Sequence, residues 1–538
     1  MVVTSRHLVA GLSLLLGACR GEVMHQVPPH IEHLGTVNFP VSCSPAAQRE
    51  FNQAVALLHH MTYPQARQAF QQVAETDSHC AMAQWGIAMT LFQPLWPTRP
   101  DSATRVRGWS AVTQARALVP PTPRESLFVA ATAAFFLDPA SPDYWQRINR
   151  WKEASGRVHA AYPQDPEATA FYALALLASA PSSNASQESF AAAADLLLGV
   201  YRQNPDHPGA MHYLVHANDA PGRERMSLDI TRKYDSLAPH NPHALHMPTH
   251  IYTRLGDWDG VIRGNLLAAD AALQYPAGDK GEFVWDEFPH AIEYLVYAYL
   301  QQGKDDSAAT QLERLRRTAR LQPTFKTAFH LSSTQARYSL ERRNWEEAAL
   351  IVPRQPSGLD WDRFAWPEAI SQFAHGLGAA HLGKLGEARA AAGRIEQLDS
   401  AMSRSGEDLF ARNIRVLQLE LDAWITEEEG KPVAARSLMQ QAVELEASTP
   451  KHAVTPAPTL PATELLGDLL MKQKQPAEAL VAYQRSLEIY PRRFNSTLGA
   501  ASAAAALGDT TAARGYYDQL LDFAGSGRRR RTRPLPSP

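Results

Sequence analysis

This chain of 538 residues has little excess of either charge, few cysteines and few long apolar runs. The formal net charge of -3 gives no whole-protein attraction to nucleic acid, so we expect no nucleic-acid partner. Alternating runs of β-branched residues are nearly absent, which argues against sheets and favours an all-α fold. The GxSxG, P-loop and GxGxxG motifs do not occur, so familiar catalytic and nucleotide-binding signatures are missing.

The one long apolar run lies at the N-terminus. In "MVVTSRHLVAGLSLLLGAC", a single early cation, Arg6, precedes an apolar stretch over residues 8–18. This stretch is too short to span a bilayer but suits a signal peptide. It ends in Leu-Gly-Ala-Cys19, which resembles a bacterial lipobox. The resemblance implies acylation of Cys19, with the envelope as location and the lipid anchor as the only membrane contact. Arg20 in place of aspartate favours the outer membrane, if the host has one.

The cysteine count agrees with export. Only Cys43 and Cys80 follow Cys19. A pair of cysteines in an oxidising compartment predicts a disulfide, although two buried thiols would also fit.

What the chain does contain is a repeat of 34 residues. Near the C-terminus, Gly467, Ala479 and Tyr483 have the spacing of the tetratricopeptide (TPR) helix-turn-helix, and Ala513 and Tyr517 repeat it. Small residues let two helices approach, and a ring fills the gap to the next pair. We therefore predict a TPR-like α-solenoid, a superhelix of antiparallel helix pairs. "STPKHAVTPAPTLPA" is one of its predicted inter-repeat loops.

Histidines follow the same repeat. "GAMHYLVHANDA" and "HALHMPTHIYTR" each hold two histidines four residues apart, and the two pairs are separated by 34 residues. With repeats that start at Pro208, Pro242 and Pro289, most of these residues take positions 2, 5 and 9 of the first helix. These positions line the concave groove in TPR proteins generally. The predicted polar strip comprises His212, His216, Asp219, His243, His246, His250, Arg254, His290, Glu293 and Tyr297.

Three interpretations of this strip remain open. The first is a non-catalytic scaffold whose groove binds an envelope protein, a peptide or a small ligand. The second is a site for zinc or a similar divalent metal, in a metal-binding protein or a metal-dependent hydrolase. The third is purely structural, with histidines hydrogen-bonded across neighbouring helices. The candidate metal ligands are His212, His216, His246, His250 and His290.

Two details bear on the metal interpretation. Pro248 biases the residue before it away from helix, so we expect His246 near a helix start and not in a regular pair with His250. "HYLVH" also lacks the glutamate that HExxH hydrolases use as general base. An open groove would spread these side chains along its wall, whereas a metal site requires at least three of them to converge.

Several phrases resemble a family of exported bacterial TPR proteins. They include "NFPVSCSPAAQREFNQAVALLHHMTY", "HPGAMHYLVHANDAPGRE" and "PHALHMPTHIYTRLGDWD", and the resemblance covers about residues 33–522. It implies an α-solenoid outside the cytoplasm and brings no activity with it. The expected organisation is a signal peptide (1–18), an anchored segment (19–44), a first solenoid (45–280), middle helical pairs (281–455), a C-terminal TPR pair (456–524) and a basic tail (525–538).

Overall fold

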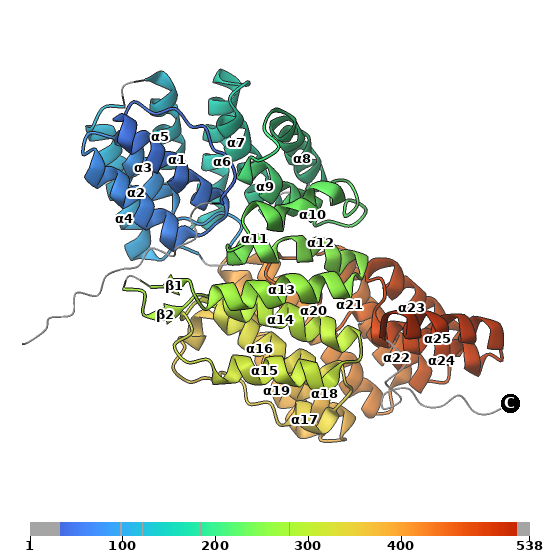
Figure 1. The fold of residues 1–538 in the computed structure, drawn as a ribbon. Coiled ribbons are helices and arrows are strands. Elements are labelled where there is room, and N and C mark those ends of the chain that lie inside the picture. Colours follow the sequence, from blue (N-terminus) through green and yellow to red (C-terminus); the bar gives the residue numbers. More distant parts are fainter. Residues whose placement is uncertain (1–32, 97–98, 121, 183–185, 279, 525–538) are drawn as a thin grey trace, which may run out of the picture.

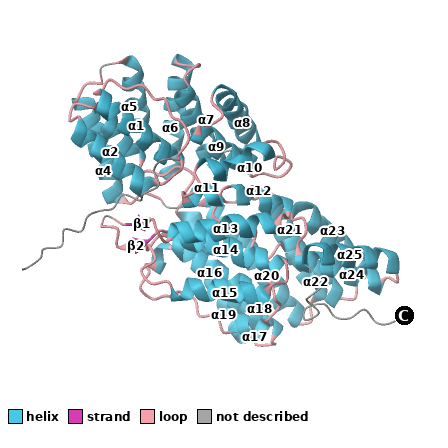
Figure 2. Ribbon diagram, viewed as in Figure 1, coloured by secondary structure: helices cyan, strands magenta, loops and turns pink. Residues whose placement is uncertain are grey.

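The computed structural model describes residues 33–96, 99–120, 122–182, 186–278 and 280–524. The predicted signal peptide, Cys19 and the basic tail lie outside these residues. The described chain is all-α apart from one pair of two-residue strands (Figures 1 and 2). Neighbouring helices along the chain pack as antiparallel pairs, which makes the protein a TPR-like α-solenoid, as predicted.

The first lobe lies at the upper left of Figure 1 and surrounds one continuous apolar core that begins at Leu34. Its helices are α1 (Pro45–His59), α2 (Tyr63–Thr76), α3 (Ala81–Met89), α4 (Ser102–Ala117), α5 (Pro123–Phe136), α6 (Tyr144–Ala161), α7 (Pro166–Ser179), α8 (Ser186–Gln203), α9 (Pro208–Asn218) and α10 (Leu228–Leu237).

The second lobe contains the remaining elements. They are α11 (Pro242–His246), α12 (Pro248–Leu255), α13 (Trp258–Ala272), β1 (Pro276–Ala277), β2 (Phe283–Val284), α14 (Glu287–Gln301), α15 (Asp305–Arg317), α16 (Phe325–Leu340), α17 (Trp345–Ala349), α18 (Ala365–His381), α19 (Leu385–Arg404), α20 (Asp408–Glu428), α21 (Pro432–Ala447), α22 (Ala462–Lys472), α23 (Pro476–Ile489), α24 (Phe494–Ala506) and α25 (Thr510–Ala524). The predicted boundary between residues 280 and 281 falls between β1 and β2, which pair antiparallel.

The C-terminal repeats pack as the spacing predicts. A Cβ atom added at Gly467 or at Gly499 would fall within 2.5 Å of the ring of Tyr483. The ring therefore fills the space between α22, α23 and α24, and only glycine leaves room for it on both sides. In the first lobe, Phe70 occupies the same kind of gap against Gly86.

The predicted disulfide is confirmed. Cys43 and Cys80 are bonded, with 5.1 Å between their Cα atoms. The bond ties the segment before α1 to the start of α3, so it closes the first repeat at its open end.

Helices α9 and α11, on either side of the junction between the lobes, begin in the same way. His207 caps α9 and Asn241 caps α11, in each case by accepting from a backbone N–H three residues on, and a proline follows each cap. Met247 keeps helical angles between α11 and α12, so the chain runs on past Pro248 without turning away. Residues of α11 and α12 contribute to the apolar cores of both lobes.

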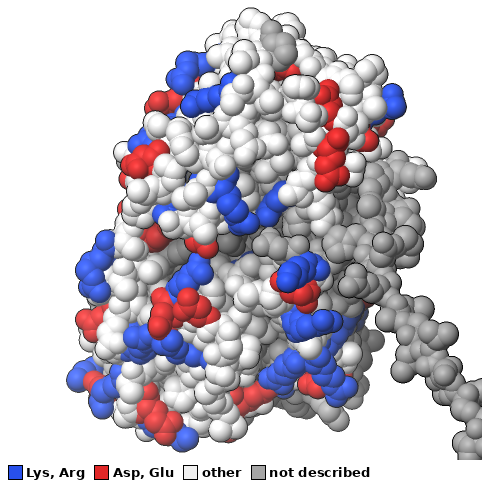
Figure 3. All heavy atoms as spheres, turned by 90° about the vertical axis from the view of Figure 1, so that its left-hand side faces the viewer, with Lys and Arg blue, Asp and Glu red and all other residues white. Residues whose placement is uncertain are grey.

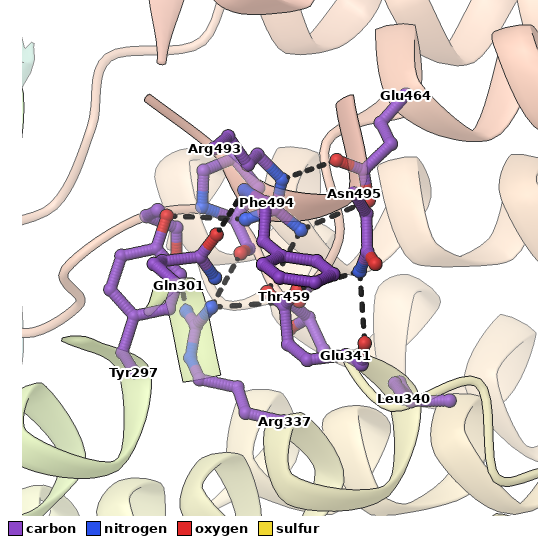
Figure 4. Close-up of polar contacts among 12 residues, drawn as sticks. Tyr297, Gln301, Arg337, Leu340, Glu341, Thr459, Glu464, Arg493, Phe494 and Asn495 are labelled. Carbon is purple, nitrogen blue, oxygen red and sulfur yellow. Dashed lines mark hydrogen bonds and ion pairs between the residues drawn. The ribbon is translucent and has the colours of Figure 1, made fainter. Parts of the chain in front are cut away.

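The solenoid closes on itself through a buried ionic network (Figure 4). Arg493, fully buried before α24, donates to Glu464 of α22 at 2.5 Å, to Glu341 after α16 at 2.8 Å and to the Tyr297 hydroxyl of α14 at 3.1 Å. Since one side chain bonds three distant elements, the C-terminal repeats are fixed against the middle of the chain. Each bond is charge-assisted or buried, where such bonds are strongest.

The face of the molecule that is drawn in Figure 3 carries charges of both signs. On the face drawn in Figure 3, lysine and arginine side chains alternate with aspartate and glutamate, without a large patch of one sign. Among the described residues, no helix combines the length and the hydrophobicity needed to cross a bilayer.

Candidate metal centre

Six histidines converge where the two lobes meet. They come from α9, α11, α12 and α14, and all are buried except His216, which is partly exposed. They form two groups of three, triad A (His212, His216 and His243) and triad B (His246, His250 and His290). In each triad the three candidate ligand atoms lie within 4.8 Å of one another.

The imidazole nitrogens within each triad meet closely. In triad A, Nε2 of His212 lies 3.1 Å from Nε2 of His216 and 3.1 Å from Nε2 of His243. In triad B, Nε2 of His246 lies 2.9 Å from Nε2 of His250, and the ring centroids of His246 and His290 are 4.2 Å apart. These distances place several ring nitrogens around one small volume in each triad.

The two triads are products of the same repeat. Each takes positions 5 and 9 of one repeat and position 2 of the next. His212 and His216 are joined by His243, just as His246 and His250 are joined by His290. The 34-residue repeat therefore builds the same three-histidine group twice. The rings of the two triads also approach each other, with 6.1 Å between the centroids of His216 and His250.

The partners of the outer nitrogens fix where the protons are. Nδ1 of His212 lies 2.6 Å from the backbone oxygen of His59, which can only accept, so this nitrogen carries the proton. Nδ1 of His246 donates to Oδ1 of Asn265 at 2.6 Å, because the amide nitrogen of Asn265 donates to a backbone oxygen. Nδ1 of His250 donates to the Asp219 carboxylate at 2.9 Å. In their neutral forms, these three rings have no proton on Nε2.

His290 reaches the same state through a relay. His330 of α16 donates from Nδ1 to the Glu293 carboxylate at 2.5 Å, which leaves its Nε2 as an acceptor. Nδ1 of His290 lies 2.9 Å from that Nε2 and supplies the proton. The Nε2 atom of His290 is consequently unprotonated as well.

Burial keeps these rings neutral. Burial lowers the pKa of His212, His216, His246 and His290 well below 6.5, and neighbouring histidines lower it further. Burial also lowers the pKa of His250 to about 4, although Asp219 opposes the shift. At neutral pH these five imidazoles are therefore uncharged, the form that binds metal ions.

Asp219 is the main charged group behind triad B. Besides His250, its carboxylate binds Arg254 Nε at 2.5 Å and Lys451 Nζ at 2.6 Å. Burial raises the pKa of Asp219, but Lys451 and Arg254 outweigh this effect and hold the pKa well below its usual value. The aspartate is ionised and orients its histidine, as carboxylates behind metal-bound histidines do.

The arrangement differs from the expected open groove. The side chains of triads A and B are enclosed between the lobes because α10, α16 and the loop over residues 448–461 pack around the first helices of these repeats. His246 ends α11 instead of starting a helix, and it does pair with His250, because Met247 stays helical. The expectation that Pro248 would separate them is wrong.

Two residues of the predicted strip lie elsewhere. Tyr297 accepts from Arg493 in the C-terminal network and does not reach the histidines. Glu293 lies one layer behind them, where it binds His330, Ser333 and Arg337. Position within the repeat did not distinguish these from the ligands, since helix faces three or four residues apart overlap only in part.

Sequence reasoning missed the groups that support the triads. His330, Asn265 and Glu287 each contact a triad histidine, the last with 3.3 Å from its Oε1 to Nδ1 of His243. His330 and Asn265 lie outside the first helices of the histidine repeats, so the 34-residue register gives no signal for them.

A third histidine group lies beside triad A but differs in kind. His59 and His207 both approach the Glu167 carboxylate, at 2.8 Å and 3.3 Å. Nδ1 of His207 accepts from the N–H of Ala210, so its other nitrogen carries the proton that points at Glu167. Nδ1 of His59 lies 3.0 Å from the hydroxyl of Tyr213, which is a donor to it when Nε2 is protonated. Here the protons point inward, onto a carboxylate.

A small cavity of about 30 Å³ lies against both triads. His216 and His243 of triad A and His250 and His290 of triad B all line it. The rest of its wall is formed by Met61, Leu95, Trp96, Met247, Lys326, Ala453 and Val454. The last two residues belong to the 448–461 loop, which therefore covers the centre.

Comparison with known proteins adds a fold likeness only. No protein-family model matches the chain, and no curated protein matches its sequence. Among solved structures, a human IFIT1 dimer with PPP-AAAA is 12% identical with a TM-score of 0.37, over 88% of this chain and 90% of that one. A Naa15/Naa10 complex bound to HypK-THB is 11% identical with a TM-score of 0.22, over 88% and 68%.

Proposed function

We propose that this protein is a metalloprotein that holds two transition-metal ions, one on each histidine triad. The helical repeats act as the scaffold that brings six imidazoles together in the interior. This is the metal-binding alternative of the sequence analysis, extended from one ion to two and from five histidines to six by the addition of His243.

One observation carries the proposal. Nε2 of His246 and Nε2 of His250 lie 2.9 Å apart. In both rings the proton is on Nδ1, which donates it to an acceptor. Neither ring is charged at neutral pH, since the pKa of each is lowered by burial. Two nitrogen lone pairs thus face each other at hydrogen-bond distance without a proton between them. A bound cation relieves this repulsion directly, whereas the nearest hydroxyl, that of Tyr294, lies 3.5 Å from Nε2 of His250.

The donor set favours particular metals. Three imidazoles per ion, with no carboxylate or thiolate among them, suit zinc, copper and nickel better than calcium, magnesium or manganese. Three protein ligands also leave a coordination position open on each ion. The supporting acceptors behind four of the six rings match the pattern that orients metal-bound histidines, and Glu287 lies 3.3 Å from Nδ1 of a fifth, His243.

Metal analysis of purified protein without a histidine tag tests the proposal. We expect about two equivalents of transition metal per chain by plasma mass spectrometry. His212→Ala and His246→Ala each remove one equivalent, and the double variant binds none. The matched control is His381→Gln, because His381 stacks on Trp345 far from the triads. Absence of bound metal after zinc and copper are supplied, or equal loss in His381→Gln, contradicts the proposal.

The envelope location and the lipid anchor at Cys19 also remain proposals. The Cys43–Cys80 disulfide supports export, since such bonds persist mainly in oxidising compartments. Cell fractionation and fatty-acid labelling of the full chain and of Cys19→Ser test them. We expect label and membrane association only with Cys19 present, and an unlabelled parent protein contradicts the anchor.

A further inference from the structure

The two triads share one cavity, so two bound ions would act on a single ligand. The cavity is lined by histidines of both triads, and its volume of about 30 Å³ suits one or two water-sized molecules. A ligand of this size in the cavity would lie beside histidines of both triads. An organic substrate does not fit while the 448–461 loop is in place.

The cavity wall selects against charged ligands. Apart from Lys326 and the histidines, the wall consists of apolar side chains and Trp96. Nζ of Lys326 is itself occupied, since it lies 3.6 Å from the centre of the Trp96 ring and pairs with Glu287. A small uncharged molecule enters such a space without the desolvation cost that an anion or a polar substrate incurs.

The charges around the triads narrow the choice of ion. Four buried carboxylates stand behind the histidines, and each has a basic partner. Asp219 binds Arg254 and Lys451, Asp286 and Glu287 share Lys326, and Glu293 binds Arg337. The four cations balance the four carboxylates, so the triads lie in surroundings without excess negative charge. Two divalent ions would bring four positive charges into this buried site, whereas two Cu(I) ions bring only two, at a lower desolvation cost.

We propose that the ion pair is copper and that its ligand is dioxygen, which the two Cu(I) ions reduce together to bound peroxide. This inference rests on the two-ion centre proposed above. Each Cu(I) gives up one electron, and O2 accepts both to become a peroxide dianion held between two Cu(II) ions. The total charge of the centre stays at two positive throughout the step. Acid then releases the peroxide as H2O2 by supplying two protons.

The test uses the full mature chain loaded anaerobically with Cu(I). Exposure to O2 should consume one O2 for every two coppers, and acid quenching should release one H2O2 per chain. The two coupled Cu(II) ions should give little or no electron paramagnetic resonance signal. His216→Ala, which we expect to hold one copper, should take up O2 at least tenfold more slowly and show an isolated Cu(II) signal.

A second variant separates the cavity from the ligands. Ala453→Leu fills the space from the loop side and leaves all six triad histidines in place. We expect it to keep two coppers and native helicity while its O2 uptake falls at least tenfold, and Ala453→Gly serves as the matched control. Unchanged uptake in Ala453→Leu, or equal uptake by the one-copper variant, overturns the inference.

Metal counting distinguishes this inference from the proposed function. A chain that holds two zinc ions and does not exchange them for copper keeps the two-ion centre and overturns the dioxygen proposal. A chain that binds no transition metal overturns both.

Discussion

Two groups of buried histidines lie in contact in this molecule, and they orient their protons in opposite directions. At four of the six triad histidines, namely His212, His246, His250 and His290, the Nδ1 proton points outward to an acceptor, and in triad B the ring lone pairs therefore face one another. In the His59–Glu167–His207 group, N–H bonds point inward to a carboxylate. The backbone oxygen of His59 even serves as the acceptor for His212. The second group is a hydrogen-bonded support for the first, although both have the composition of a metal site.

The comparison shows that residue type and proximity do not define a metal site. The three side chains of the inward group also place their candidate ligand atoms within 4.8 Å of one another. Glu167 satisfies both histidines there, and these histidines lower the pKa of Glu167 against the opposing effect of burial. What marks triad B, and His212 of triad A, is the direction in which the outer nitrogens donate.

Metal removal should have the largest effect. Chelation of both ions should lower the free energy of unfolding by about 4 kcal/mol for each ion when free metal stands about 1,000-fold above Kd. Denaturant titrations with and without a chelator measure the loss. Glu167→Gln should show the same difference between the two conditions, since its group binds no ion. A smaller difference in that variant would mean that the His59–Glu167–His207 group also binds metal.

Glu167→Gln itself should have the next largest effect. The substitution removes the carboxylate between two buried histidines and should cost about 3–5 kcal/mol of stability. The cost should be equal with and without chelator, and the metal content should stay at two equivalents. Thr169→Val, two residues further along α7, is the control for a polar change on the same helix. Loss of metal in Glu167→Gln would contradict a purely supporting role.

Acid should lower the stability of the folded protein even without metal, because buried hydrogen-bonded histidines resist protonation. His60 donates to the backbone oxygen of Leu34 and accepts from Tyr234, and burial lowers its pKa to about 3. The unfolded chain binds the proton at a pKa near 6.5, so stability is complete above pH 6.5 and falls as the pH drops toward 3. For chelated protein, His60→Gln should reduce the slope by up to about 1.4 kcal/mol per pH unit. An unchanged slope would show that His60 is protonated in the folded protein.

Removal of one side chain that supports triad B should have the smallest effect, and this effect should be confined to one ion. Asn265→Ala removes the acceptor for His246 and should weaken metal binding at triad B by about 10- to 100-fold. Titration with a competing chelator should show one weakened ion and one unchanged ion per chain. Asn413→Ala, whose amide only donates to its own helix, is the matched control. Equal weakening of both ions would mean that the triads are not independent sites.

Much of the fold could be predicted from the sequence, because the spacing of small and aromatic residues in the repeat indicates how its helices pack. Gly467 and Tyr483 recur at fixed spacing, and the ring fills the place that the spacing predicts. The disulfide followed from having only two cysteines after Cys19. The closure of the second lobe through Arg493 could not be predicted, because its partners lie 29 to 196 residues away.

The predicted strip contained all six histidines, but it also contained Glu293 and Tyr297, which lie elsewhere, and the predicted metal ligands left out His243. Register placed the six histidines on one set of helix faces, and that was enough to gather them. Register could not show that they are enclosed, because the covering loop comes more than 150 residues after His290. Nor could it show the proton directions, which depend on Asn265, His330 and a backbone oxygen. The local effect of Pro248 was overestimated, since Met247 keeps helical angles directly before it.

The 448–461 loop has a consequence for the order in which the protein is assembled. Arg337 donates to the backbone oxygen of Pro458 at 2.8 Å and binds Glu293, which holds His330 and through it His290. All six imidazoles belong to residues before 291, whereas the loop that covers them comes from the last fifth of the chain. A chain that emerges N-terminus first thus presents a complete but uncovered set of ligands before its cover exists. If the protein holds metal as proposed, ions would load during this interval, and once the later repeats dock, exchange would have to wait for the C-terminal part of the molecule to open.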